Sequence, residues 1–422
     1  MSGLASFLDT TQDQTVGRLG DLQWSWPYAL GLAIFFLLRG LYLRRPLTRN
    51  HVLGAVALAV IARLAYDSGR GVLGFIALAL AGAVLVFPKT TKAAPEELGR
   101  VFALVNRSRD DPLAPFVMHS AKGYFFNSDG TAALGYRARL GIAAVAGDPV
   151  GERTDFADLI EEFQAHCRSN GWRVAVLAAG EYCAPLWSRH GLRTVPIGRD
   201  VVIDVASFTL QGRQWRNLRQ AVQRTHNAGI TTEVRSERGL DKETLAELRR
   251  LVASSDHRHA NRGFSMILDH LLDGRTPGIL LAIARDAEGR AVAFHRYATA
   301  DEGRMLTLDV PYRSADAPNG VDERLSVDMV HHGKEHGGEK VSLAFAAFPE
   351  IFESTHRGAG QQAVYVATHL LDPLIRIESL YRFVRKFRAL DGQRFAMVRL
   401  RQVAFVLAAF LVLEFVPHRR RS

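Results

Sequence analysis

The stretch DGTAALGYR (Asp129–Arg137) decides the fold, because it returns in outline 159 residues later as EGRAVAFHR (Glu288–Arg296). Each copy has an acidic residue and a glycine, then alanine two positions after the glycine and arginine seven positions after it. An acid–glycine turn followed by a short strand-like run is typical of a β-hairpin. The offset is about one small domain, so it predicts a tandem duplication, with chance similarity between two hairpins as the alternative.

Helix and strand patterns alternate along the chain after residue 95. Helices are indicated by apolar residues at a 3.6-residue period, and strands by short apolar or alternating runs between turn residues. The expected helices are 155–168, 212–227, 241–254 and 321–336, and the expected strands are 132–139, 142–146, 173–178, 280–285, 291–297, 305–310 and 340–344. This alternation predicts a mixed α/β (α+β) unit that is used twice.

Three apolar stretches lie in the first ninety residues, at 24–43, 51–66 and 71–87. A helix that spans a bilayer needs about 20 residues, and the second and third stretches are near the lower limit. We therefore expect two or three transmembrane helices. Loops rich in lysine and arginine usually lie on the cytoplasmic side of a membrane. The basic loop 44–49 therefore predicts that this loop and the large region after residue 92 lie on the cytoplasmic side of the cell membrane.

The expected organisation is a membrane anchor at 1–92, a first domain at 93–230 and a second domain at 231–422. A further apolar run, 403–416, contains Glu414 and is about 14 residues long, which favours a buried or interfacial helix over a span.

Charge and cysteine content narrow the partners and the compartment. The net charge is +10 and the pI is near 9.8, which fits anionic lipid head groups or RNA, or reflects only solubility and anchoring. The two cysteines, Cys167 and Cys183, form no CxxC pair and have no metal-ligand spacing, so we expect structural thiols in a reducing compartment. The HxxEH-like run His332–His336 lies at an expected helix end and has no evident third ligand, so no metal or cofactor is expected.

An arginine-rich helix is the first candidate binding element. At about 100° per residue, its arginines fall within one face of roughly 140°, and apolar side chains lie on the other side. These arginines are Arg213, Arg216, Arg219 and Arg224. Guanidinium groups on one face suit phosphate, although a solvated basic face is the alternative.

A strand that runs into a turn and a helix start is the second candidate. The strand carries Asp309 and Arg313, and the turn contains Asn319 and Gly320 just before Glu323 in the first helical turn. A helix start of this kind can hold an anion or a carbonyl oxygen, and Asp309 could orient an amine or accept a proton. A structural turn with a surface ion pair is the alternative.

Two shorter segments complete the candidates. The turn Gly263-Phe264-Ser265 joins two helical segments and offers an aromatic ring and a hydroxyl, with a plain loop as the alternative. The amphipathic stretch Glu378–Arg388 is basic and aromatic, and it presents Lys386 to a phosphate of lipid or nucleic acid, or else closes the domain with solvated charges.

Together these runs resemble the synthase domain of the aminoacyl-phosphatidylglycerol synthases, the multiple peptide resistance factor family. The resemblance covers roughly residues 95–400. The matching motifs are YFF at 124–126, GDPVG at 147–151, LR at 218–219, GFSM at 263–266, APNG at 317–320, VSLAFA at 341–346, and LYRF at 380–383 with KF at 386–387. Their order and spacing make the set specific, although each is short.

The resemblance implies tandem acetyltransferase-like (GNAT) domains in the cytoplasm. It also implies transfer of an amino acid from aminoacyl-tRNA to the hydroxyl of a membrane lipid such as phosphatidylglycerol. The expected partners are aminoacyl-tRNA and the anionic phospholipid membrane, and a homo-oligomer is possible. On this basis Asp309 binds the α-amino group, Arg313 neutralises nearby charge, and Arg216, Arg219 and Arg224 hold phosphate. The turn Gly263-Phe264-Ser265 is expected to contact substrate. The remaining positions, Asn319, Gly320, Glu323 and Lys386, shape the pocket or contact phosphate.

Two departures from the family pattern bear on this expectation. The family commonly has Asp-Leu-Met-Arg where this chain has Asp309-Val310-Pro311-Tyr312, and it commonly carries a many-helix flippase domain. The sequence does not identify which amino acid is transferred or which lipid accepts it. Three alternatives also stay open: a membrane-tethered acyltransferase with another donor such as acyl-CoA, a non-catalytic lipid- or tRNA-binding module, and aminoacyl transfer to a cell-wall precursor.

Overall fold

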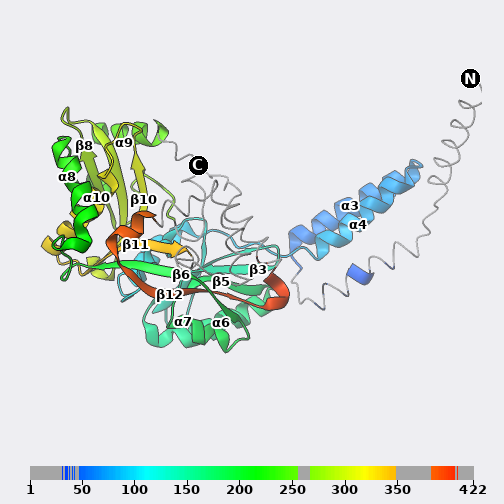
Figure 1. The fold of residues 1–422 in the computed structure, drawn as a ribbon. Coiled ribbons are helices and arrows are strands. Elements are labelled where there is room, and N and C mark those ends of the chain that lie inside the picture. The colour runs from blue at the N-terminus through cyan, green and yellow to red at the C-terminus, as the bar shows by residue number, and fades with distance from the viewer. Residues whose placement is uncertain are drawn as a thin grey trace, which may run out of the picture. The chain divides into compact units, whose positions relative to one another are not determined.

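The computed structural model describes residues 47–254, 267–347 and 382–403, with Val406 and scattered positions between 31 and 42. The strands are β1 (Gly123–Phe126), β2 (Ala132–Arg139), β3 (Ile142–Ala146), β4 (Val150–Gly151), β5 (Arg173–Ala179), β6 (Arg193–Asp204), β7 (Thr231–Ser236), β8 (Ile279–Arg285), β9 (Ala291–Ala300), β10 (Met305–Arg313), β11 (Lys340–Ala347) and β12 (Leu390–Val398). They form one mixed sheet in the order β1-β2-β3-β5-β12-β6-β11-β10-β9-β8-β7, with β4 paired to β2 (Figure 1).

Three of the described helices precede the first strand, and the others lie between strands in the chain. They are α3 (Arg49–Asp67), α4 (Gly71–Leu85), α5 (Leu98–Val105), α6 (Phe156–Ser169), α7 (Cys183–Ser188), α8 (Arg216–Asn227), α9 (Lys242–Ser254) and α10 (Val321–Glu335). Short 3-10 turns occur at Pro95–Glu97, Ala114–Met118, Arg153–Asp155, Arg213–Trp215, Glu237–Gly239, Asp301–Gly303, Arg385–Phe387 and Leu400–Gln402. The helices expected around 155–168, 241–254 and 321–336 are therefore present within one or two residues.

The two halves of the sheet repeat one pattern. The strand order β1-β2-β3-β5 in one half corresponds to β8-β9-β10-β11 in the other, and α6 or α10 connects the last two strands of each set. The two quoted sequence stretches become the turn and second strand of the hairpins β1–β2 and β8–β9. Gly130 and Gly289 adopt left-handed φ angles of 70° and 79° in these turns, which explains the shared glycine.

Strand β12 returns from the C-terminal part of the chain to lie between β5 and β6. Its buried Arg394 holds this position through three carboxylates: Nε is 2.8 Å from Asp200, Nη2 is 2.7 Å from Asp111 and Nη1 is 3.4 Å from Asp148. Burial raises the pKa of Asp148 to about 6 and of Asp200 to about 7, against the opposing charge of Arg394. Moving β12 away would leave these buried carboxylates without the compensating charge of Arg394, which is energetically costly. The cluster therefore ties β12 to the first half of the sheet.

Two hydrophobic cores hold the layers together. One contains residues of α5 and α9, such as Leu104 and Leu248, together with Val310 and Tyr312 of β10. The other contains residues of α8 and α10 and the opposite side of β10, including Leu308. Leu308 and Val310 are two residues apart but face opposite cores, because the β-bulge between them shifts the alternation of side chains along β10.

Strand β6 is an element that the sequence patterns did not predict. It spans twelve residues, but Pro196 and Gly198 interrupt its apolar pattern, and both residue types are uncommon inside strands. Here Gly198 permits a close approach, since a Cβ at this position would lie 2.3 Å from the carbonyl oxygen of Ala346 on β11.

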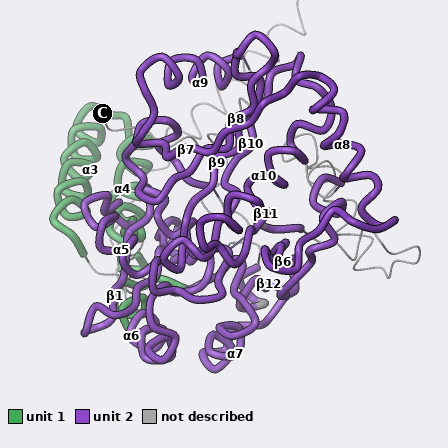
Figure 2. Tube along the Cα trace, turned by 90° about the vertical axis from the view of Figure 1, so that its left-hand side faces the viewer, with its two compact units in different colours: residues 1–90, 165–173 green, residues 91–164, 174–422 purple. Residues whose placement is uncertain are grey.

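By contacts the chain divides into two units, residues 1–90 with 165–173, and residues 91–164 with 174–422 (Figure 2). In the first unit, α3 and α4 pack side by side through small residues, including Ala62 and Ala77, while Leu53 and Leu64 are 67% and 63% exposed. Among the described residues, no helix combines the length and apolarity that crossing a bilayer requires. The expected stretches 51–66 and 71–87 correspond to α3 and α4. Most of 24–43 and of the run 403–416 lies outside the described residues. The assignment of transmembrane helices therefore stays a prediction.

Candidate functional site

The candidate site lies where β10 diverges from β11. These parallel strands pair at Met305–Thr307 with Lys340–Ser342, and a β-bulge follows between Leu308 and Val310. The connection after β10 then leads to α10, so the second half of β10 and the first turn of α10 form one corner of the fold. Bulges of this type redirect side chains and are common beside functional sites.

Gly320 fixes the start of α10. It is the N-cap residue, with a left-handed φ of 105°, and it provides no side-chain cap for the first-turn N–H groups. A Cβ at this position would lie 2.5 Å from the carbonyl oxygen of Ala221 on α8. Glycine is therefore required on two grounds, backbone conformation and close packing of α8 against the start of α10.

Charged side chains surround this helix start. The imidazole Nε2 of His295, on β9, lies 3.1 Å from the Asp322 carboxylate, and Arg313 Nη1 lies 3.5 Å from the same carboxylate. His295 is fully buried, whereas about a quarter of the Asp322 side chain is exposed. Asp322 and Glu323 occupy the first turn, where a negative charge interacts favourably with the helix dipole.

Lys386 brings the C-terminal segment to the same place. It forms an ion pair with the buried Glu323, and the neighbouring Phe387 is buried in the core beneath α8 and α10. The ring of Phe383 lies 6.5 Å from that of His295 and 5.4 Å from that of Phe387. We call this group the α10 N-terminal site, which consists of Arg313, Asn319, Gly320, Glu323 and Lys386 with His295 and Asp322.

Asp309 lies elsewhere. Its carboxylate is fully buried, 2.9 Å from Arg296 Nη1, and it accepts a hydrogen bond of 2.8 Å from the Leu268 N–H. Burial raises the pKa of Asp309 to about 6, with Arg296 opposing the shift. Arg296 also pairs with the buried Glu237 at 3.1 Å.

These contacts place Asp309 and Arg313 on opposite faces of the sheet. The partner Leu268 belongs to the core beneath α9, whereas Arg313 pairs with Asp322 on α10. The structure therefore separates the two residues that the sequence suggested as a catalytic pair, because the bulge at Asp309 changes the alternation along β10.

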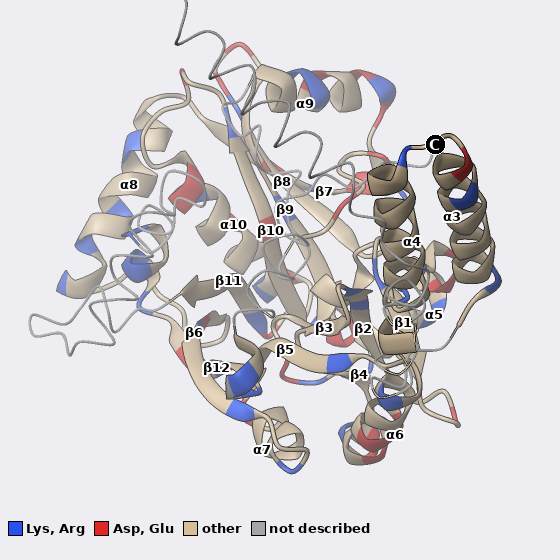
Figure 3. Ribbon diagram, turned by 90° about the vertical axis from the view of Figure 1, so that its right-hand side faces the viewer, with Lys and Arg blue, Asp and Glu red and all other residues tan. Residues whose placement is uncertain are grey.

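The arginine-rich helix has the expected exposed basic face. Leu218, Ala221 and Thr225 of α8 are buried. Arg216, Arg219 and Arg224 are exposed, and Figure 3 shows basic residues along this helix. Arg219 donates to the carbonyl oxygens of Leu210 and Gly212, so part of its hydrogen-bonding capacity holds the preceding loop. We call these three arginines the basic face of α8.

Two remaining sequence candidates have different outcomes. Gly263, Phe264 and Ser265 lie outside the described residues. Tyr312, which replaces a family arginine, is buried and stacks on Phe294 with ring centroids 5.2 Å apart. Burial raises its pKa to about 12. Tyr312 therefore fills the core rather than presenting charge.

No sequence motif marks His295, Arg296 or Asp322 as a site residue. The first two were visible only as part of the repeated hairpin, and Asp322 only as an acid in a helix start. A buried histidine beside a carboxylate becomes apparent only when β9 and α10 are placed together.

Fold and site together define a mixed α/β protein with a repeated strand–helix unit and a charged site at a helix start. A family model described as "Phosphatidylglycerol lysyltransferase, C-terminal" matches residues 102–398. The chain belongs to this family, as the resemblance indicated, and membership confirms the expectation of an aminoacyltransferase.

Relatives and solved structures agree. An MprF-like domain protein of Mycobacterium tuberculosis is 47% identical over 410 residues, which are 96% of this chain and 84% of the relative. The lysylphosphatidylglycerol biosynthesis bifunctional protein LysX of Rhodococcus jostii is 34% identical over 260 residues, which are 61% of this chain but 23% of that protein. The structure of L-PGS from Bacillus licheniformis matches with a TM-score of 0.66 at 22% identity, covering 78% of this chain and 98% of that one, which supports the fold.

Proposed function

We propose that this chain transfers an amino acid from aminoacyl-tRNA to the hydroxyl of a membrane lipid such as phosphatidylglycerol, at the cytoplasmic face of the membrane. The observation that carries the proposal is the packing of α8 against the α10 N-terminal site at Gly320. It sets a row of exposed guanidinium groups beside a helix start that holds a partly exposed carboxylate. A polyanionic donor and a reacting ester would then meet at one corner of the fold.

The proposed reaction needs no covalent enzyme intermediate. The lipid hydroxyl oxygen forms a bond to the ester carbonyl carbon, and the bond from that carbon to the terminal ribose oxygen of the tRNA breaks. The proton lost by the lipid hydroxyl passes to the ribose oxygen. An aminoacyl ester is already activated, so placement and stabilisation of the oxyanion could supply most of the rate.

Each residue of the α10 N-terminal site has a role in this scheme. Asp322, held by His295 and Arg313, accepts the hydroxyl proton, and the first-turn N–H groups of α10 face the developing oxyanion. Arg313 and Lys386 neutralise nearby negative charge. Asn319, Gly320 and Glu323 shape the helix start, and the basic face of α8 contacts tRNA phosphates.

For Asp309 the described contacts favour a positioning role. Its carboxylate is engaged by Arg296 and the Leu268 N–H, and in this arrangement it fixes the bulge that turns Arg313 toward α10. Direct binding of the substrate amine by Asp309 stays a prediction, as does contact of Gly263, Phe264 and Ser265 with substrate.

The first unit supports the membrane part of the proposal. The apolar side chains of α3 and α4 are exposed over much of their length, including Leu53, Leu64, Leu73 and Leu80. Exposed apolar surface of this extent is typical of a protein or membrane contact. We propose that this part of the chain anchors the enzyme in the cell membrane, next to its acceptor lipid.

The test uses the full chain in vesicles that contain phosphatidylglycerol, with tRNA charged with one labelled amino acid at a time. Label that enters the organic extract, and that RNase abolishes, supports the proposal and identifies the donor. Label that enters lipid from acyl-CoA instead would support an acyl-CoA-dependent enzyme, and tRNA binding without transfer would support a binding module.

A further inference from the structure

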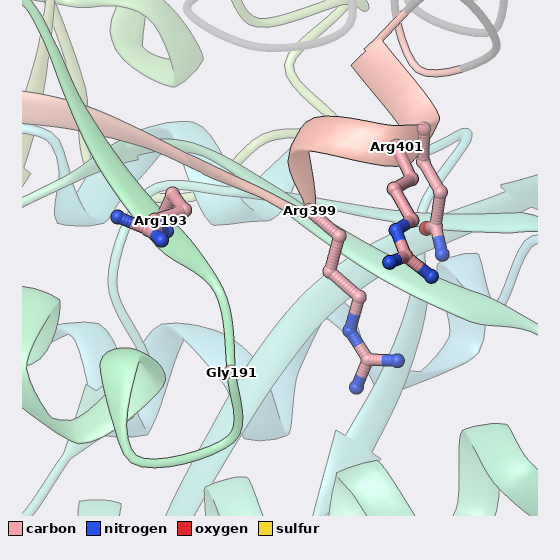
Figure 4. A pocket seen from close by; sticks show the side chains of 5 residues that line it. Gly191, Arg193, Arg399 and Arg401 are labelled. Atoms are coloured by element: carbon pink, nitrogen blue, oxygen red, sulfur yellow. The ribbon is translucent and has the colours of Figure 1, made fainter.

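Two charged regions of the fold differ in whether they contain a base. One is a pocket of about 540 Å³ beside the end of β12, lined by Gly191, Arg193, Arg399, Arg401 and Gln402. Figure 4 shows Arg399 between Arg193 and Arg401. Guanidinium groups stay protonated at neutral pH and an amide does not titrate, so none of these side chains accepts a proton. The other region, the α10 N-terminal site, pairs a carboxylate with an imidazole.

That carboxylate ends a row of three side chains. Tyr297 and His295 are two residues apart on β9, so both point to the face of the sheet that α10 covers. The phenol oxygen of Tyr297 lies 3.5 Å from His295 Nδ1, and His295 Nε2 lies 3.1 Å from the Asp322 carboxylate. Tyr297 and His295 are fully buried, whereas about a quarter of the Asp322 side chain is exposed. The row therefore leads from the core to an accessible carboxylate.

The chemistry of the three groups favours one direction for these hydrogen bonds. An ionised carboxylate only accepts, so the nitrogen that faces Asp322 carries the proton, which makes Nε2 the N–H of His295. In the neutral ring Nδ1 is then an acceptor, and the structure places the Tyr297 hydroxyl beside it as the donor. Burial raises the pKa of the Tyr297 phenol, against a hydrogen bond from Ser326. The charges of Asp322 and Asp328 add to this rise in pKa, so the phenol keeps the proton that it donates.

This arrangement holds Asp322 in the form that a base requires. Its Oδ1 accepts from His295 Nε2–H, and its Oδ2 lies 3.5 Å from Arg313 Nη1. Donors on both oxygens favour the ionised carboxylate over the acid. The ring of Phe383, which lies 6.5 Å from that of His295, adds no charge. If the imidazole turned over, carbon atoms would face both the carboxylate and the phenol, and both hydrogen bonds would be lost.

We propose that Tyr297 is a positioning residue for the transfer. Its hydroxyl holds the His295 ring in the orientation and tautomer in which Nε2–H faces Asp322, and so keeps Asp322 able to accept the proton of the attacking hydroxyl. Tyr297 is buried and touches no substrate. Phenylalanine would fill the same space without a buried hydroxyl that needs a partner, so the hydroxyl itself points to a polar role.

The inference rests on the proposed role of Asp322 as the base, but the tautomer of His295 can be measured without any transfer. The variant is Tyr297→Phe, which keeps the ring and should fold. Tyr136→Phe is the matched control, because Tyr136 is also buried on a strand but packs against Phe163 in the first half of the sheet.

The first measurement is nuclear magnetic resonance of the full chain with isotopically labelled histidine, in which the nitrogen chemical shifts show which imidazole nitrogen carries the proton. The signals of His295 are assigned by their absence from His295→Gln. We expect a protonated Nε2 and a bare Nδ1 at neutral pH in the wild type and in Tyr136→Phe, and a mixture of states in Tyr297→Phe. A proton on Nδ1 in the wild type, in the other tautomer or in an imidazolium, would overturn the inference.

The second measurement is the transfer assay as a function of pH. Tyr297→Phe should lower kcat by roughly twofold to tenfold, the effect of one hydrogen bond, with KM for charged tRNA unchanged. The acid limb of its pH–rate profile should move to higher pH, because Asp322 loses part of the donation that favours its ionised form. His295→Gln should retain more activity than His295→Leu, because the glutamine amide still offers an N–H.

The outcomes separate this inference from the proposed function. If Tyr136→Phe and Tyr297→Phe share the kcat and pH profile of an active wild type, Tyr297 has no positioning role. A Tyr297→Phe protein that is only less stable, with an unmoved acid limb and the wild-type tautomer, would show that the hydroxyl serves the core alone. A wild type that transfers nothing would contradict the proposed function, and the tautomer of His295 would then decide whether the hydrogen-bonded row exists.

Discussion

Replacing Gly320 with alanine should strongly destabilise the second half of the sheet and its helices, because it combines backbone strain with a steric clash. Alanine at a φ of 105° costs about 1–3 kcal/mol in backbone strain. The added Cβ would lie 2.5 Å from the Ala221 carbonyl oxygen, and overpacking of this kind costs about 1–3 kcal/mol more. The expected loss in the free energy of unfolding is therefore roughly 2–6 kcal/mol, out of the 5–15 kcal/mol typical of a folded protein.

Gly289→Ala is the matched control for this variant. Gly289 also has a left-handed φ, 79°, but a Cβ there would meet no atom within 4 Å. It should therefore lose only the backbone contribution. Urea unfolding of both full-length variants can be followed by tryptophan fluorescence, to which Trp215, just before α8, contributes. Equal losses for the two variants would refute the close packing of α8 on the start of α10.

Three further predictions concern the site and the buried charges. Asp322→Asn should lower kcat by roughly a hundredfold or more with little change in KM for charged tRNA, because it removes the proposed base. Asp316→Asn, at an exposed aspartate, should have no effect. Equal kcat for the two variants would exclude Asp322 as the base. The double variant Arg216→Gln, Arg224→Gln should raise KM for charged tRNA. It should also reduce the slope of the logarithm of the tRNA-binding constant against the logarithm of salt concentration by about 0.7–0.9 per arginine, while a charge-matched Lys242→Gln, Arg250→Gln control on α9 leaves both quantities unchanged. An unaltered slope would indicate a merely solvated face. Burial raises the pKa of Asp200 from its ordinary value of 3.8 to about 7 in the folded protein. Its contribution to stability is therefore present at low pH and is lost as pH rises from about 4 to about 7. Urea unfolding across this pH range should show the wild type losing stability relative to Asp200→Asn, and a gain would contradict the buried cluster.

The fold could be predicted to a large extent because its signals are local. The repeated acid–glycine turns gave the hairpins, and the apolar periods of α6, α9 and α10 gave helices close to their observed bounds. The missing elements depend on tertiary context. Strand β6 contains proline and glycine, and β12 is inserted between β5 and β6 from a distant part of the chain, which no local pattern reports.

The site was predictable in composition but not in grouping. Arg313, Gly320, Glu323 and Lys386 were expected from their motifs, and the structure brings them together at the start of α10. Asp309 was expected beside Arg313, but a one-residue bulge is invisible in sequence and places it with Arg296 on the other face. His295 required the packing of β9 against α10 to become a candidate.

The most direct test of the central claim is a parallel transfer assay of the wild type and Asp322→Asn in vesicles that contain phosphatidylglycerol, with each labelled aminoacyl-tRNA in turn. The account predicts RNase-sensitive transfer of label into lipid by the wild type, and loss of that transfer in the variant although tRNA binding is retained. Absence of transfer by the wild type with every charged tRNA, or full transfer by Asp322→Asn, would contradict it.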